Sequence, residues 1–317
     1  MARHAVAVIL PAFNEAATVA AVIEHFHRSL PDAFLCLVDN ASTDGTGSIA
    51  SEHLRKLGAP GLVLLETARG KANAIRRAFL EVDADVYLMA DADLTYPADE
   101  ARKLLDPVVR GDADMVVGDR ISAGHYAAEN KRPGHEFGNT LVAGIINRLY
   151  GSRLQDVLSG YRAFNRRFIK NYPVLVRGFE LETDLTLHAL EMRHRILEVP
   201  IAYRDRPQGS VSKLNTTRDG MRVLTAIFQI FRHYRPMAFF GAAGVVLGIA
   251  GLVAGLGPLA DYVQHRYVYR LPLAVLAVGL ELSALFSLST GLVLSTIVRG
   301  QRAWAERALL AEGPCRD

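Results

Sequence analysis

Short apolar runs alternate with amphipathic segments through the first part of the chain. The apolar runs are rich in Val, Ile and Leu and span residues 5–10, 34–38, 62–66 and 85–90. Such runs are typical of strands that are buried on both faces. The segments between them carry apolar side chains at helical spacing and span residues 15–29, 47–57 and 71–82. This alternation predicts an α/β domain with a mainly parallel sheet.

The alternation weakens after residue 115. The pattern then predicts a strand, a helix, a loop, a helix and a strand, near residues 115–120, 139–150, 154–167, 181–194 and 196–206. Residues 219–235 place apolar side chains on one helical face and arginines on the other. We expect this segment to be an amphipathic helix in the lipid headgroup layer, with an ordinary surface helix as the alternative.

Two long apolar stretches follow. Residues 237–260 contain no charged residue and residues 271–298 contain only Glu281, and each stretch is long enough to cross a bilayer as a helix. Two buried helices of a soluble protein are the alternative. Basic residues flank the outer ends of the pair, namely Arg232, Arg235, Arg299 and Arg302. We therefore expect both outer ends to lie in the cytoplasm.

These patterns divide the chain into four parts: an α/β domain at 1–218, the amphipathic helix at 219–235, a transmembrane hairpin at 236–300 and a tail at 301–317. We expect the domain and both termini to be cytoplasmic, at the inner membrane, without a signal peptide. The net charge of +3 and the lack of long Lys/Arg runs argue against nucleic-acid binding. Cys36 and Cys315 lie far apart, which argues against a disulfide framework.

Polar loops follow all four early strands. They read PAFNE, DNASTDGT, ARGK and DADLTYP, and ligands of parallel sheets bind beyond the carboxyl ends of the strands. The second loop contains Gly45-x-Gly47-x-x-Ala50, which formally matches a dinucleotide fingerprint. It follows the second strand after six polar residues, so we interpret Gly45 as a turn residue that begins a helix.

Asp91 and Asp93 follow the fourth apolar run directly. Two carboxylates this close repel each other unless a cation lies between them. Their oxygen atoms suit Mg²⁺ or Mn²⁺, which commonly bind phosphate oxygens as further ligands. The sequence therefore predicts a metal site that is completed by a diphosphate.

The motifs VILPAFNEAATV, LVDNASTDGT, RGKANAI, DADLTYP and SGYRAF occur in this order, and LEVPIAYRDR and SVSKL follow them. The series resembles the inverting family 2 glycosyltransferases with the GT-A fold. With the two terminal spans, it is most similar to the polyprenyl-phosphate glycosyltransferases, which include dolichyl-phosphate mannose synthase. The resemblance covers residues 5–300 and implies a membrane enzyme that transfers a hexose from a UDP- or GDP-sugar to polyprenyl (undecaprenyl) phosphate.

The resemblance also implies roles for individual residues. Nucleotide-sugar contacts are expected from Pro11, Asn14, Glu15, Asp39, Lys71, Asp91 and Asp93. Asp91 and Asp93 are the expected metal ligands, and Asp93 is expected, together with Asp156, to be a catalytic residue. Asn40 departs from the second aspartate of many members, which leaves the identity of the base open. Contacts to the lipid phosphate are expected from Arg120, Arg132, Arg206, Ser212 and Lys213.

Asp156 matches the family position assigned as a base or an orienting carboxylate. A structural role holding Arg162 or the loop is the alternative, and Glu182 and Asp184 are further candidates for the base. The resemblance implies one in-line displacement at the anomeric carbon, with inversion. Because a phosphate acceptor is already anionic, charge positioning should matter more than a strong base.

Two other functions stay open: a family 2 transferase with a different acceptor, and a catalytically inactive membrane adaptor. Processive synthases carry a QxxRW segment, and the only tryptophan, Trp304, lies after the second span. Glu281 is a carboxyl inside that span. Such groups commonly face a partner helix, so we expect a helix contact within a homo-oligomer.

Overall fold

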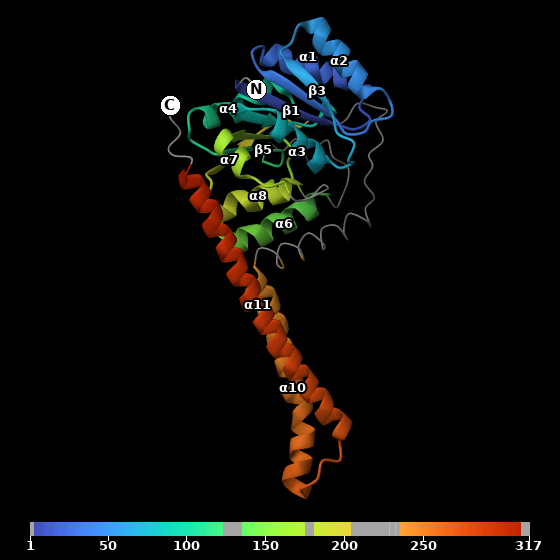
Figure 1. Cartoon of the computed structure of the whole chain (residues 1–317), viewed down its shortest axis with the longest axis vertical. Coiled ribbons are helices and arrows are strands. Elements are labelled where there is room, and N and C mark those ends of the chain that lie inside the picture. Colours follow the sequence, from blue (N-terminus) through green and yellow to red (C-terminus); the bar gives the residue numbers. More distant parts are fainter. Residues whose placement is uncertain are drawn as a thin grey trace. The chain divides into compact units, whose positions relative to one another are not determined.

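The computed structural model describes residues 3–122, 135–174, 181–203, 228, 232 and 235–311. The chain divides into two compact units, Met1–Arg218 and Asp219–Asp317, which are described separately (Figure 1).

The first unit contains a seven-stranded sheet in the order β3-β2-β1-β4-β6-β5-β7. Its strands are β1 (His4–Ala12), β2 (Phe34–Asp39), β3 (Gly61–Leu65), β4 (Ala84–Met89), β5 (Met115–Asp119), β6 (Arg162–Asn165) and β7 (Ile196–Pro200). All described pairings are parallel except those of β6, which runs antiparallel to β4 and β5. The predicted mainly parallel α/β sheet is therefore confirmed.

Helices cover both faces of this sheet (Figure 1). They are α1 (Val19–Ser29), α2 (Thr46–Leu57), α3 (Lys71–Glu81), the 3₁₀ turn η1 (Ala98–Glu100), α4 (Ala101–Val109), α6 (His135–Tyr150), α7 (Arg166–Asn171) and α8 (Leu181–Glu191). The helix expected over 15–29 begins only at Val19, because the N–H groups of Thr18 and Val19 both bond to the Glu15 carbonyl in a turn.

The strands are continuously apolar because they separate two cores. Val8 and Leu10 of β1 pack into one hydrophobic cluster with Phe26 of α1 and Leu104 of α4. Ala7 and Ile9 pack into the other cluster, which includes helices α3, α7 and α8. Successive strand residues point to opposite faces, so both sets must be apolar. This arrangement leaves the loops at the strand ends to carry the polar groups.

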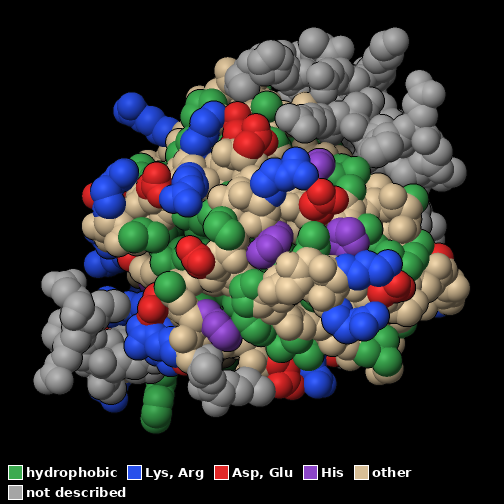
Figure 2. Space-filling view, turned by 90° about the horizontal axis from the view of Figure 1, so that it is seen from above, with side chains coloured by type: hydrophobic (Ala, Val, Ile, Leu, Met, Phe, Trp, Pro, Cys, Tyr) green, Lys and Arg blue, Asp and Glu red, His purple; other side chains and the backbone are tan. Residues whose placement is uncertain are grey.

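The surface seen from above shows no large area of one charge. Lys and Arg side chains alternate with Asp and Glu side chains over this face (Figure 2). Such a surface agrees with the small net charge of the chain.

The second unit is a helical hairpin of α10 (Pro236–His265) and α11 (Leu271–Ala311). Both helices are long and apolar enough to cross a membrane, judged by length and composition. Of the amphipathic segment expected at 219–235, only Phe228, Arg232 and Arg235 are among the described residues.

Glycines of α10 let the two helices of the hairpin approach closely. A Cβ added to Gly244 would lie 2.8 Å from Leu288 Cγ, and one added to Gly251 would lie 2.7 Å from Glu281 Oε1. Small residues allow such close contact between membrane helices. Glu281 therefore contacts α10 of its own chain, and the expected contact within an oligomer stays a prediction.

Candidate active site

The carboxyl ends of six strands lie at one edge of the sheet, together with the start of the antiparallel strand β6. β1 to β4 run parallel, and β5 and β7 run parallel to each other. Because β6 is antiparallel to both β4 and β5, these two strands share one direction. The loop at 156–161, which leads into β6, therefore lies at the same edge as the loops after the parallel strands. We call this edge the carboxyl edge.

The loops after β1 and β2 are joined by hydrogen bonds. Asn14 Oδ1 accepts the N–H of Thr43 at 2.8 Å, and the N–H of Asn14 donates to Ser42 Oγ at 3.0 Å. Asn14 adopts a positive φ of 54°. The N–H of Glu15 donates to Thr46 Oγ1 at 2.9 Å. Asn14 and Glu15 thus shape the carboxyl edge.

Pro11 lies inside β1, opposite Val38 of β2, rather than in the loop that follows the strand. Pro11 is thus close to Asn14 in sequence, but it belongs to the strand and not to the loop that is hydrogen-bonded to the loop after β2.

Asp39 ends β2, and its carboxylate packs on the start of α2. Its Oδ1 atom accepts the N–H of Ser42 at 3.0 Å. A Cβ on Gly47 would lie 2.5 Å from Asp39 Oδ2, so a glycine is needed for this approach. Gly45 precedes α2 with a φ of 88°, which confirms its interpretation as a turn residue. The fingerprint-like glycines therefore serve the turn and the position of Asp39.

Asn40 fixes the loop after β3. Its buried side chain donates from Nδ2 to the carbonyls of Glu66 and Ala68, at 3.2 and 2.7 Å, and accepts the N–H of Gly70 at 2.7 Å. An aspartate could accept the last bond but could not donate the first two. The departure from the family pattern thus has a structural reason, which sequence reasoning missed.

Lys71 begins α3 and pairs with two carboxylates. Its Nζ lies 2.5 Å from Asp91 Oδ1 and 2.7 Å from Glu182 Oε1 of α8. Burial lowers the pKa of Lys71, but the charges of Asp91 and Glu182 outweigh this effect and hold the pKa above its ordinary value. Lys71 is therefore a fixed positive charge at the end of β4.

Asp93 lies two residues after Asp91 and is almost completely buried, at 4% exposure. Its Oδ1 accepts the hydroxyl and the N–H of Thr95, at 2.5 and 3.2 Å. Among the described residues, no group of three or more His, Cys, Asp or Glu side chains could hold a metal. Two carboxylates without a third still fit Mg²⁺ or Mn²⁺, because these ions commonly take one or two carboxylates together with substrate phosphates.

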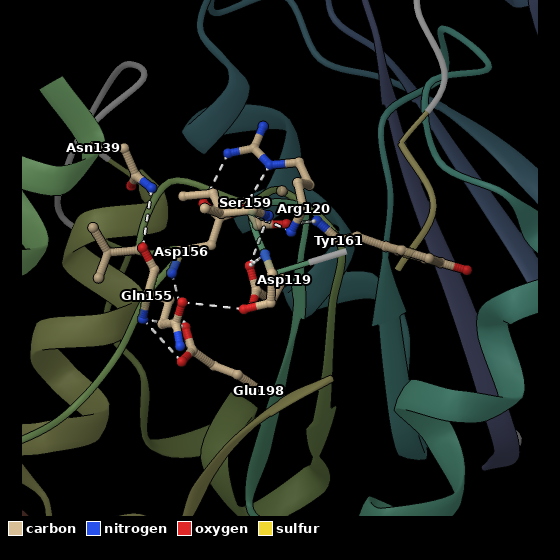
Figure 3. Close-up of polar contacts among 12 residues, drawn as sticks. Asp119, Arg120, Asn139, Gln155, Asp156, Ser159, Tyr161 and Glu198 are labelled. Atoms are coloured by element: carbon tan, nitrogen blue, oxygen red, sulfur yellow. Dashed lines mark hydrogen bonds and ion pairs between the residues drawn. The ribbon is translucent and has the colours of Figure 1, made fainter. Parts of the chain in front are cut away.

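Asp156 is bound through both carboxylate oxygens by Arg120, which follows β5 (Figure 3). Arg120 Nε donates to Oδ2 at 2.7 Å and Nη2 donates to Oδ1 at 2.9 Å, and the Arg120 N–H also bonds to Oδ2 at 3.1 Å. The Asp156 side chain is fully buried, and that of Arg120 is 12% exposed. Such bidentate pairs are strong and directional, so each side chain fixes the other.

Glu198 of β7 holds the backbone beside Asp156 (Figure 3). Its carboxylate accepts the N–H groups of Gln155 and Asp156, with all distances at 2.9 Å. Burial raises the pKa of Glu198, the two backbone bonds oppose the rise, and the charges of Asp119 and Asp156 add to it. Sequence reasoning missed Glu198, although a lone carboxylate inside the apolar run ILEVPI was a usable signal.

Among the described residues no hydrogen bond joins Arg162 to Asp156, so of the two structural roles considered for that carboxylate only that of holding the loop stays open. The fully buried guanidinium donates to the carbonyls of Val157 and Ser159, both at 2.8 Å, and to Thr186 Oγ1 at 2.9 Å. Arg162 thus shapes the loop while Asp156 binds Arg120.

The two further candidates for a base have other partners. Glu182 binds Lys71, and Asp184 accepts the hydroxyl of Tyr172 at 2.7 Å. Four of the expected phosphate ligands lie outside the described residues: Arg132, Arg206, Ser212 and Lys213.

A model of the family described as glycosyl transferase family 2 matches residues 7–172. Glycosyltransferase AglJ of Haloferax volcanii is 33% identical over 272 residues, which are 84% of this chain and 83% of that protein. The polyprenol monophosphomannose synthase of Mycolicibacterium smegmatis is 28% identical over 70% of this chain and 84% of its own length.

Solved structures share the fold. The mannosyltransferase PcManGT of Pyrobaculum calidifontis, solved in complex with GDP-Man and Mn²⁺, has a TM-score of 0.51 and 17% identity, and the match covers 99% of this chain and 80% of that one. The sheet of the first unit is thus of the GT-A type.

Proposed function

The chain belongs to glycosyltransferase family 2, and on this premise we propose that it transfers a hexose from a nucleotide diphosphate sugar to polyprenyl phosphate at the membrane. The observation that carries the proposal is the ion pair of Lys71 with Asp91 just after the end of β4, with Asp93 two residues further along the same loop. Beyond that strand end, an anionic diphosphate finds a fixed ammonium and two carboxylates that suit a divalent cation.

The donor contacts come from the first four loops. We assign Asp39, at the end of β2, to the base and ribose part of the nucleotide, and Lys71 to the diphosphate. Asn14 and Glu15 hold the loops that frame Asp39 through bonds to Ser42, Thr43 and Thr46. Asp91 and Asp93 would hold Mg²⁺ or Mn²⁺, which supplies positive charge against the leaving diphosphate.

The acceptor assignment is supported by relatives that are named for polyprenol phosphates. The Asp156–Arg120 pair supports it from the structure, because Asp156 fixes a guanidinium at the same edge as the donor site. We assign Arg120 to the acceptor phosphate and Asp156 to its orientation. Further phosphate contacts are proposed for Arg132, Arg206, Ser212 and Lys213.

The reaction is one displacement. A phosphate oxygen of the lipid forms a bond to the anomeric carbon, while the bond from that carbon to the donor phosphate oxygen breaks. The electron pair leaves with the nucleoside diphosphate, and the configuration inverts. A phosphate monoester is largely ionised near neutral pH, so the protein mainly needs to position charge and exclude water.

The membrane placement follows from the second unit. We propose that α10 and α11 both span the inner membrane, since both are long and apolar enough. Arg232 and Arg235 before the first span, with Arg299 and Arg302 after the second, favour a cytoplasmic location for both outer ends.

Membranes that contain the protein, given undecaprenyl phosphate and labelled UDP- or GDP-hexoses, test the function. Label should enter the lipid extract with one donor, and removal of divalent metal should reduce its entry. A folded protein that labels no lipid with any donor contradicts the proposal.

A further inference from the structure

Lys71 lies between carboxylates from two different elements of the carboxyl edge. Its Nζ is 2.5 Å from Asp91 Oδ1, after β4, and 2.7 Å from Glu182 Oε1, on α8. The side chains are 15%, 30% and 7% exposed for Lys71, Asp91 and Glu182, respectively. One ammonium is thus shared between the partly exposed carboxylate of Asp91 and the nearly buried carboxylate of Glu182.

The backbone of Gly160 packs closely against the Lys71 ammonium. A Cβ added to Gly160 would lie 2.9 Å from Lys71 Nζ, 3.1 Å from Asp91 Oδ2 and 3.3 Å from the Tyr96 hydroxyl. The N–H of Gly160 donates to that hydroxyl at 2.9 Å, which fixes this backbone. The ammonium therefore has no room on the Gly160 side.

A divalent ion on Asp91 would share that carboxylate with the ammonium. Because both are cations, each weakens the binding of the other, and the effect is strong for partly buried charges. Glu182 offers the ammonium a second carboxylate of opposite charge at hydrogen-bonding distance. Loss of the Asp91 contact therefore does not leave Lys71 unpaired.

We propose that Lys71 competes with the divalent metal for Asp91, and that Glu182 holds the ammonium when the metal takes that carboxylate. This inference rests on the proposed function in one respect, the assignment of Asp91 as a metal ligand. It makes Lys71 and Glu182 regulators of metal affinity in addition to the role of Lys71 at the diphosphate.

Competition predicts opposite effects for two isosteric substitutions. Lys71→Met removes the competing cation and should tighten Mn²⁺ binding about tenfold. Glu182→Gln removes the second negative charge beside the ammonium, so the ammonium depends more on Asp91, and Mn²⁺ binding should weaken about tenfold. A tenfold change in affinity corresponds to about 1.4 kcal/mol.

A variant that carries both substitutions distinguishes competition between Lys71 and the metal from a general effect of charge on metal affinity. If Glu182 acts only through Lys71, then Lys71→Met/Glu182→Gln should bind Mn²⁺ as tightly as Lys71→Met alone. Independent charge effects would instead add, and the double variant would return to the affinity of the unsubstituted protein.

The measurement is the binding of Mn²⁺ alone, without donor, to the purified full-length protein in detergent, read from the electron paramagnetic resonance of free Mn²⁺. Asp91→Asn should abolish the effect of Lys71→Met. The proposal is overturned if Lys71→Met leaves the affinity unchanged or lowers it, if the two single effects simply add, or if neither the unsubstituted protein nor Lys71→Met binds Mn²⁺.

Folding is checked by thermal melting. If Lys71→Met does not fold, Glu182→Gln and the double variant are compared instead, because removal of Lys71 should still tighten binding in that background. Sugar transfer is not measured in this experiment. Failure of transfer therefore counts against the proposed function, whereas unchanged Mn²⁺ affinity counts only against the competition.

Discussion

The Arg120 guanidinium donates two hydrogen bonds to Asp156, and both depend on the carboxylate. In Asp156→Asn one oxygen becomes an amide that cannot accept a bond from the guanidinium. We predict that kcat falls about a hundredfold, with little change in the KM for the donor, because we assign the pair to the acceptor phosphate and not to the donor. Steady-state kinetics check this.

Glu24→Gln is a suitable control for Asp156→Asn, since in the part of the chain that the structure describes Glu24 forms a partly exposed ion pair with Arg28 on α1 and no other. An unchanged kcat for Asp156→Asn would remove the proposed orienting role of this carboxylate.

At position 40 an amide stabilises the fold in a way that a carboxylate cannot. In Asn40→Asp the new oxygen would face the carbonyls of Glu66 and Ala68, which now accept hydrogen bonds from Nδ2. We predict a loss of about 1–3 kcal/mol in the free energy of unfolding and a higher KM for the donor, since the affected loop leads into Lys71.

Thermal melting and donor kinetics measure both effects of Asn40→Asp. Asn73→Asp is the matched control, because the Asn73 amide makes one exposed bond, to the Arg69 carbonyl. Equal destabilisation by the two substitutions would contradict a special role for Asn40.

His188 gives the first unit a pH dependence. Its ring is buried against Phe168, Tyr172 and His194, and burial, followed by the charge of His194, lowers its pKa from 6.5 to about 4. Between these values the unfolded chain binds more protons than the folded one, so stability falls as the pH falls. We predict a loss of about 3 kcal/mol across that range.

Melting temperatures of the unsubstituted protein and of His188→Leu, compared from neutral pH down to about pH 4, test this contribution. The substituted protein should lose less stability on acidification. Parallel curves for the two proteins would contradict it.

At the residue scale, the sequence singled out candidate side chains but not the way in which they pair. Asp91, Asp93, Lys71 and Asp156 were all singled out from motifs. The pairings were not predicted, because Lys71 and Glu182 are separated by 111 positions and Arg120 and Asp156 by 36. Only the folded sheet brings these pairs together.

At the scale of elements, the positions of the strands were easier to predict than the way in which the strands pair in the sheet. The early strands are recognisable because both of their faces are buried in the two cores. β6 has only four residues, Arg162–Asn165, and its antiparallel place between β4 and β5 depends on partners far away in the chain. Local pattern contains no such information.

The hairpin of α10 and α11 depends on close approach at Gly244. A Cβ there would meet Leu288 Cγ at 2.8 Å and the backbone oxygen of Ala284 at 3.1 Å. We predict that Gly244→Ala separates the helices and costs about 1–3 kcal/mol. Gly279→Ala should be tolerated, because a Cβ at Gly279 meets nothing within 4 Å.

Trp304 is the only tryptophan and lies in α11, so its fluorescence reports on this unit during thermal unfolding. The same thermal-unfolding midpoint for Gly244→Ala and Gly279→Ala would contradict the predicted close contact between Gly244 and α11.

At the scale of the whole molecule, the composition shift near residue 236 and the order of the motifs predicted an α/β domain followed by two apolar helices, and the structure has both. The sequence could not identify the sugar or the nucleotide. Contacts between residues far apart in the chain, such as those of Asn40 and Glu198, arrange the loops of the carboxyl edge, and the local sequence pattern does not contain them.

The metal assignment is tested by Asp93→Asn. The amide keeps the shape of the side chain but removes the charge that would bind the cation. We predict that metal-dependent transfer falls about a hundredfold or more, measured as label in the lipid extract at saturating donor. Full activity in this variant would remove Asp93 from the metal site.

The central claim is that the sugar is transferred to a polyprenyl monophosphate. The most direct measurement is the mass of the lipid formed when the purified protein, undecaprenyl phosphate, Mn²⁺ and a series of UDP- and GDP-hexoses are incubated together. We predict one new lipid, with the mass of the acceptor plus one hexosyl residue, from one of these donors. Unchanged acceptor with every donor, from a protein that is folded by thermal melting, would contradict the claim.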